Sequence, residues 1–131
     1  MNPSSLPKLT DAEFEIMGIV WEEGETTVNS VWKAINQIRE APLSRTTILV
    51  QMNRLEEKGW LKHRAVGKTF IYSSTRQRDK TLEVLIGDLH NRLFKGSSSD
   101  LVKCLFKSVK ISNAEIQKLK EIIKNHEGEL E

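Results

Sequence analysis

Three side chains that could contact the edges of nucleic-acid bases recur at helical spacing in the middle of the chain. Thr46, Val50 and Asn53 are four and three residues apart, so they lie on one side of a helix. In the major groove of DNA an apolar side chain can contact the thymine methyl group, and an asparagine amide can bind adenine N6 and N7. These residues, with Leu49 at the margin of the same side, are therefore the predicted base contacts.

The residues that flank this side of the helix have groups that bind phosphates. Hydroxyl and guanidinium groups commonly bind the DNA backbone, although the hydroxyls here could instead cap the helix itself. The predicted backbone contacts from this segment are Ser44, Arg45, Thr47 and Arg54.

The helix that must position these residues is predicted from Ser44 to Lys58. Ser44 is a favourable N-cap, and Gly59 can adopt the left-handed conformation that ends helices. Ile48, Met52 and Leu55 gather on the side opposite Thr46, Val50 and Asn53, which indicates one buried and one free side. The alternative interpretation is an ordinary solvated surface helix.

A basic hairpin is predicted directly after this helix. Residues 60–64 and 69–73 are rich in β-forming residues, and Gly67 lies in the connection, where a hairpin needs a positive φ. We expect a two-stranded wing whose Lys62, Arg64 and Lys68 contact the DNA backbone. Lysines on edge strands also discourage aggregation, and both roles are compatible.

Two further helices precede the predicted DNA-contacting helix. Thr10 and Glu13 form a capping box for a helix that extends to about Glu22, and Thr26 or Thr27 can cap a second helix that has ended before Pro42. Three helices followed by a hairpin indicate a winged helix-turn-helix domain over residues 1–75. The fold class is therefore mainly α with a small antiparallel β wing.

The distribution of charge also favours a polyanionic partner for the middle segment. The net charge of the whole chain is only +2. Residues 45–78 contain eight Lys or Arg and two acids, whereas residues 11–25 contain six acids and no base. DNA should therefore contact the middle segment rather than the first helix.

Residues 76–131 are predicted to form three amphipathic helices. Asp100 could cap the second, Ser112 and Glu115 form a capping box for the third, and residues 126–131 should fray. About fifty residues make a marginal isolated core, so we expect these helices to form a homodimer. The predicted interface residues are Leu82, Leu85, Ile86, Leu89, Leu93, Leu101, Leu105, Phe106, Ile116, Leu119, Ile122 and Ile123.

Several other classes of protein are disfavoured by the sequence. It has no Gly-x-Ser-x-Gly motif, Walker loop or dinucleotide-binding turn, so we expect neither an enzyme nor a cofactor. The single cysteine, Cys104, permits no intramolecular disulfide and no cysteine cluster for a metal, and its apolar neighbours predict a buried, inert thiol. Without a long apolar span or signal-type N-terminus, we expect a cytoplasmic protein without membrane contact.

Several short motifs resemble the penicillinase repressor and methicillin-resistance repressor family, the BlaI/MecI/CopY transcriptional regulators. The similar segments are Leu9–Glu13 through Trp21, Thr47-Ile48, Arg54-Leu55, Lys58-Gly59, and Gly67-Lys68 followed by Tyr72. The resemblance covers most of the chain. It implies a homodimeric repressor that binds an inverted-repeat operator of the TACA/TGTA kind in double-stranded DNA.

The resemblance also implies two modes of induction. In β-lactam-responsive members a protease cuts an Asn–Phe bond in the dimerisation helices, but Cys104-Leu105 stands at the similar positions here, which argues against cleavage by that inducing protease. Copper-responsive members have a cysteine-rich motif, whereas no cysteine follows Cys104. Two alternatives to a repressor are a winged-helix module that binds an acidic protein and a thiol-switched sensor.

Overall fold

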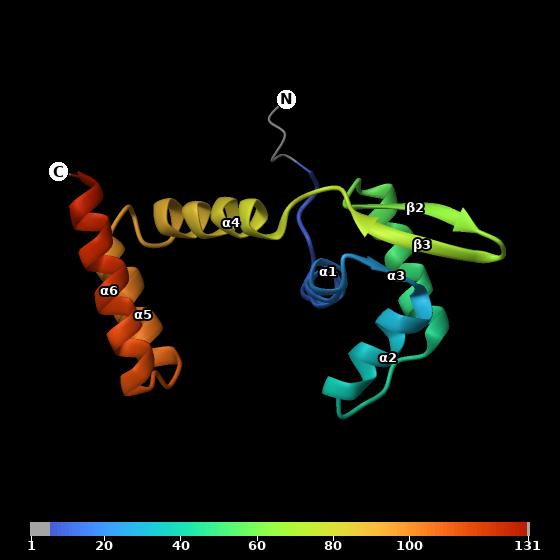
Figure 1. The fold of residues 1–131 in the computed structure, drawn as a ribbon, viewed down its shortest axis with the longest axis horizontal. Helices are drawn as coiled ribbons and strands as arrows, with labels where there is room; N and C mark the ends of the chain where they lie inside the picture. Colours follow the sequence, from blue (N-terminus) through green and yellow to red (C-terminus); the bar gives the residue numbers. More distant parts are fainter. Residues whose placement is uncertain (1–5, 131) are drawn as a thin grey trace. The chain divides into compact units, whose positions relative to one another are not determined.

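A computed structural model describes residues 6–130, which form six helices and three strands (Figure 1). The elements are α1 (Asp11–Glu23), β1 (Glu25–Thr26), α2 (Val28–Ile38), α3 (Arg45–Glu57), β2 (Leu61–Val66), β3 (Thr69–Ser74), α4 (Arg78–Arg92), α5 (Ser98–Ser108) and α6 (Asn113–Leu130). The chain divides into two compact units, residues 1–85 and 86–131. The predicted fold class, mainly α with a small antiparallel sheet, is confirmed.

The helices of the first unit begin where their capping residues predict. At the start of α1 the Thr10 side chain accepts from the Glu13 amide, and the Glu13 carboxylate accepts from the Thr10 amide, so the capping box is present. Thr27 caps α2 and Ser44 caps α3. Local side-chain chemistry therefore sets all three helix starts.

The sheet has three strands rather than the two predicted. The short β1 pairs with β3, which gives the antiparallel order β1-β3-β2. The two long strands extend to Val66 and from Thr69, so a two-residue turn joins them instead of the four-residue connection expected. Gly67 has a φ of +62° at the first turn position, as a type II′ turn requires.

The core of the first unit lies between α1, α2, α3 and the sheet. Its apolar side chains are buried from all three helices, and Leu61 and Tyr72 add the sheet's contribution. The fully enclosed members include Ile16, Met17, Val20, Val31, Ile35, Ile48, Met52 and Leu55. This core packs α3 against the strands that follow it, and α3 lies beside them in the ribbon (Figure 1).

The second unit differs from several expectations. Ser97, not Asp100, caps α5: its hydroxyl accepts from the Asp100 amide, which places Asp100 in the first turn. Helix α6 continues to Leu130, so the fraying predicted from residue 126 is wrong. Cys104 is exposed rather than buried, because apolar neighbours on a helix enclose a thiol only when another element covers them.

The helices at the C-terminal end have no buried core of their own. Neither α4 nor α5 buries a residue, and the described side chains of α6 are at best partly buried. Among residues 6–130, no helix is sufficiently long and apolar to cross a membrane.

Candidate nucleic-acid interface

The turn between α2 and α3 is held by side chains of α2. Asn36 makes two hydrogen bonds to the Leu43 backbone, donating to its carbonyl at 3.0 Å and accepting from its amide at 2.9 Å. The Trp32 indole donates to the same carbonyl at 2.8 Å. These contacts fix the chain one residue before the N-cap of α3, so the start of this helix has a defined position.

Helix α3 has the buried and free sides that its sequence predicts. Ile48, Met52 and Leu55 are fully buried, whereas Thr46, Val50 and Asn53 are exposed. Val50 retains 49% of its accessible surface, so its apolar side chain is open to contact with a partner. Leu49 is partly buried and packs against the core, so it is less accessible than the other three predicted base contacts.

The first turn of α3 places polar groups at the surface. Ser44 accepts from the Thr47 amide at 3.1 Å, and the two hydroxyl groups lie 2.9 Å apart. Arg45 Nε donates to Asn29 Oδ1 at 2.5 Å. Asn29 was not predicted at this surface, because it lies outside the apolar side of α2 and no local spacing relates it to Arg45.

The basic residues of the hairpin are all exposed, but they differ in their partners. Arg64 Nη2 lies 2.6 Å from Glu25 Oε2, and both side chains remain more than half exposed. Within the described residues, Lys62 and Lys68 form no ion pair. Their ammonium groups are therefore available to an anion, whereas Arg64 must exchange or share a partner.

Aromatic and acidic side chains join the hairpin to α3. His63 Nδ1 lies 2.5 Å from Glu56 Oε1, and the imidazole stacks on Phe70 with ring centroids 4.3 Å apart. On the neighbouring strand, the buried Tyr72 donates its hydroxyl to Asn53 Oδ1 at 3.4 Å. The hairpin thus contacts the same helix that presents the predicted base contacts.

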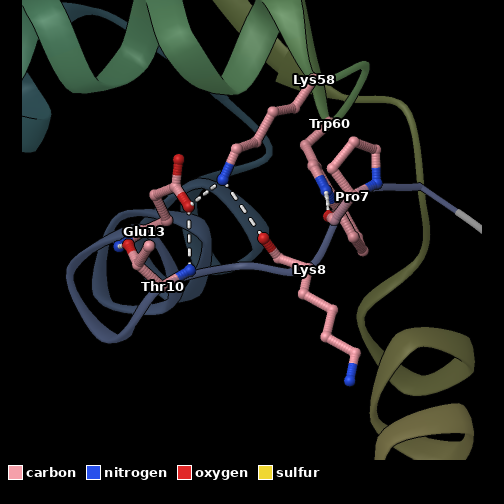
Figure 2. Close-up of polar contacts among 6 residues, drawn as sticks. All are labelled: Pro7, Lys8, Thr10, Glu13, Lys58 and Trp60. Carbon is pink, nitrogen blue, oxygen red and sulfur yellow. Dashed lines mark hydrogen bonds and ion pairs between the residues drawn. The ribbon is translucent and has the colours of Figure 1, made fainter.

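The far end of α3 is tied to the chain that precedes α1 (Figure 2). Lys58 Nζ donates to Glu13 Oε1 at 2.6 Å and to the Lys8 carbonyl at 3.2 Å, and the Trp60 indole donates to the Pro7 carbonyl at 2.8 Å. Burial by itself raises the pKa of Glu13, but hydrogen bonds from Lys58 and Thr10 outweigh it and leave that pKa lowered. Glu13 is therefore ionised in the folded protein at neutral pH.

The two oppositely charged segments meet at two points. Glu13 and Glu25 belong to the acidic segment, and their partners Lys58 and Arg64 belong to the basic one. Part of the positive charge that was predicted to bind DNA is thus already paired with acidic side chains of the same unit. Among the backbone contacts predicted from sequence, Ser44, Arg45, Arg54, Lys62, Arg64 and Lys68 are exposed, and Thr47 is partly buried.

The chain is similar to known regulatory proteins in both sequence and structure. A penicillinase repressor of Bacillus licheniformis is 28% identical over 123 residues, which cover 94% of this chain and 94% of that protein. The methicillin resistance regulatory protein MecI of Staphylococcus aureus strain N315 is 25% identical over 116 residues, or 88% of this chain and 93% of its own. A solved DNA-binding domain of the repressor BlaI aligns with a TM-score of 0.50 and 30% identity, covering 56% of this chain and 88% of that domain.

The family model described as penicillinase repressor matches residues 9–125. This range includes α1 with its capping box, the exposed side of α3, the hairpin and most of α6. The match spans far more than half of the sequence and confirms the resemblance inferred from its short motifs. The chain belongs to the penicillinase repressor family.

Proposed function

We propose that this protein is a transcriptional repressor that binds double-stranded DNA sequence-specifically as a homodimer. The observation that supports this most directly is the exposed side of α3, where Thr46, Val50 and Asn53 face solvent beside a basic hairpin. Family membership supports the same proposal, because one similar solved structure is the DNA-binding domain of the repressor BlaI.

In this proposal, α3 lies in the major groove and the hairpin follows the phosphate backbone. Val50 contacts a thymine methyl group, while Thr46 and Asn53 form hydrogen bonds with base edges. Arg45, Arg54, Lys62 and Lys68 bind phosphates, as do Ser44 and Thr47 where their hydroxyls are not engaged at the helix cap. Arg64 joins them when DNA displaces Glu25.

The homodimer is proposed from apolar side chains that the single chain leaves uncovered. None of the predicted interface residues is buried: Leu82, Leu89, Leu101, Ile116 and Leu119 are partly buried, and Leu85, Ile86, Leu93, Leu105, Phe106, Ile122 and Ile123 are exposed. Soluble proteins rarely leave so much apolar surface open to water. Pairing two copies through residues 76–131 would cover it and present two α3 helices to an inverted repeat.

Dimerisation also explains how repression could be relieved. When two half-site contacts are linked, the second becomes an intramolecular step with a high effective concentration, so the dimer binds much more tightly than a monomer. Any signal that separates the C-terminal helices would release the DNA. An inducing protease fits this scheme only if it cuts a bond other than Asn–Phe, since Cys104-Leu105 occupies the similar positions.

Selection of bound fragments from the source genome by the full-length protein tests the proposal. We expect enrichment of an inverted repeat, a symmetric footprint on it, and affinity that falls with rising salt concentration. The matched control replaces Thr46, Val50 and Asn53 together with alanine, which leaves the basic residues intact. If this variant selects the same sequences with equal affinity, α3 does not read the bases and the proposal is wrong.

A further inference from the structure

The side-chain amide of Asn53 has a buried partner that limits how it can face DNA. Asn53 lies on the exposed side of α3, yet its Oδ1 accepts a hydrogen bond at 3.4 Å from the hydroxyl of Tyr72, a residue that is only 1% exposed. Burial and the nearby charge of Glu56 raise the pKa of Tyr72. The phenol therefore stays protonated, and its hydroxyl can donate a hydrogen bond to the amide oxygen of Asn53.

The position of the Tyr72 hydroxyl is set by its surroundings. Tyr72 belongs to the central strand of the sheet, where it pairs with Thr26 on one side and with His63 on the other. The His63 imidazole also reaches α3 through Glu56, which is three residues after Asn53 on the same helix. The strand and the helix are thus joined at two neighbouring points, which restrict the movement of the buried phenol relative to Asn53.

We infer that Tyr72 is a positioning residue that sets the base preference of Asn53 by holding its Oδ1 inward and its Nδ2 outward. This inference rests on the proposed function, because it requires the exposed side of α3 to meet base edges. With its oxygen engaged, Asn53 presents an N–H donor to the groove. A donor alone can bind guanine O6 or N7, thymine O4 or adenine N7, but it cannot accept from the N6 amino group of adenine.

The inference changes the base expected opposite Asn53. The common pairing of asparagine with adenine uses both amide atoms, because the oxygen accepts from N6 while the nitrogen donates to N7. That bidentate pairing needs the oxygen that Tyr72 holds. We therefore expect guanine or thymine to be preferred over adenine at the operator position that Asn53 contacts, because the adenine N6 amino group would find no acceptor there.

The test measures base preference at each half-site position for the full-length protein and four variants. They are Asn53→Ala, Tyr72→Phe, the double variant and Thr46→Ala, and competition binding compares all four bases at every position. Asn53→Ala identifies the position that this residue reads. Tyr72→Phe should lower discrimination at that same position by about fivefold, as expected for one hydrogen bond, and raise the relative affinity for adenine.

The remaining variants separate positioning from general damage. Tyr72→Phe should have no additional effect when Asn53 is already alanine, and Thr46→Ala should alter a different position. The slope of log affinity against log salt concentration should stay unchanged in Tyr72→Phe, because no phosphate contact is removed. A uniform loss of affinity for all four bases in Tyr72→Phe would mean a structural role and overturn the inference.

Two further outcomes distinguish this inference from the proposed function. If the unsubstituted protein selects an operator but Asn53 reads an adenine, and removing the adenine N6 amino group weakens binding, the inference fails while the repressor proposal stands. This comparison needs no Tyr72 variant and so holds even if Tyr72→Phe does not fold. If the unsubstituted protein shows no sequence preference, both fail.

Discussion

Lys58 Nζ lies 2.6 Å from Glu13 Oε1 and so joins the C-terminal end of α3 to the first turn of α1 (Figure 2). The Glu13 side chain is 2% exposed and the Lys58 side chain 22% exposed, so water screens the pair only weakly. The same carboxylate oxygen accepts from the Thr10 amide at 2.8 Å. One carboxylate therefore holds a helix cap, the preceding segment and the end of the proposed DNA-reading helix together.

Replacing Glu13 with glutamine should destabilise the protein by about 2–3 kcal/mol at pH 7, because a partly buried lysine loses its counter-charge. The neutral amide can still accept from Thr10, so most of the change reports the ion pair. Chemical denaturation, with the free energy of unfolding extrapolated to water, measures it. Glu15→Gln is the matched control: Glu15 lies on the same helix in a partly exposed pair with Arg39, 3.6 Å apart, and its loss should cost less than about 0.5 kcal/mol.

The Glu13–Lys58 pair also predicts a pH dependence of stability. The pKa of Glu13 is lowered in the folded protein below its ordinary value of 4.5, so its contribution is complete above that value and is lost as pH falls through the folded-state pKa. The difference between the unsubstituted protein and Glu13→Gln should therefore shrink on acidification below about pH 4.5. A difference that stayed constant down to pH 3 would show that the carboxylate charge is not what stabilises the fold.

Lys58→Met tests the same pair from the other side. Without the ammonium group the burial of Glu13 is less well compensated, so its pKa should rise relative to that in the unsubstituted protein. The cost of Lys58→Met should then be largest at neutral pH and smaller near pH 4, where Glu13 can be protonated. Unfolding curves at the two pH values give this comparison directly.

Alanine substitutions at Gly59 and Gly18 should change the free energy of unfolding in opposite directions. Gly59 has a φ of +92°, and an added Cβ would lie 3.1 Å from Leu6 Cδ2, so Gly59→Ala should destabilise the protein by about 1–2 kcal/mol. Gly18 lies within α1 with open space around it, so Gly18→Ala should stabilise by about 0.5–1 kcal/mol. Thermal unfolding of both variants checks the pair, and a stabilised Gly59→Ala would contradict the assignment of Gly59 as a required helix stop.

Much of the first unit could be predicted because its signals are local. The capping residues Thr10 and Ser44, the buried side of α3 and the hairpin glycine each act within a few residues of the structure they determine. The exposed side of α3 follows from the same helical period. These features specify a fold without knowledge of distant partners.

The features that were missed depend on partners far apart in the chain. Glu13 and Lys58 are 45 residues apart, and Tyr72 and Asn53 are 19 apart, so no periodicity relates them. The two-residue β1 has too few residues for a strand pattern and exists only because β3 offers a free edge. Cys104 was predicted to be buried from its apolar neighbours, but Val102, Leu105 and Phe106 are themselves exposed in a single chain.

Replacing a hairpin lysine should weaken DNA binding, whereas replacing the acidic partner of a hairpin arginine should strengthen it. Lys68 is exposed in the turn itself, and Lys68→Ala should weaken binding to every sequence and make the salt slope shallower by about one unit. Glu25→Gln should strengthen binding about two- to fivefold, because it removes the carboxylate that competes with phosphate for Arg64. Fluorescence anisotropy at several salt concentrations measures both effects.

Lys118→Ala is the matched control for the loss of one positive charge. Lys118 lies on α6, where its ammonium group is 3.6 Å from Glu115, outside the proposed DNA interface. Its replacement should leave the salt slope unchanged. If Lys118→Ala and Lys68→Ala reduce the slope equally, the hairpin makes no particular phosphate contact and only net charge matters.

Disruption of the apolar surface on α6 should separate the proposed dimer. Ile122 and Ile123 are 62% and 60% exposed in the single chain, so replacing both with glutamate leaves the fold of the first unit intact but places four charges in a two-copy interface. Sedimentation equilibrium should show a monomer, and affinity for a full inverted repeat should fall to about that for a half-site. Ile38→Glu is the control, because Ile38 is 73% exposed on α2 and outside residues 76–131. A double variant that remains dimeric would exclude these two residues from the interface.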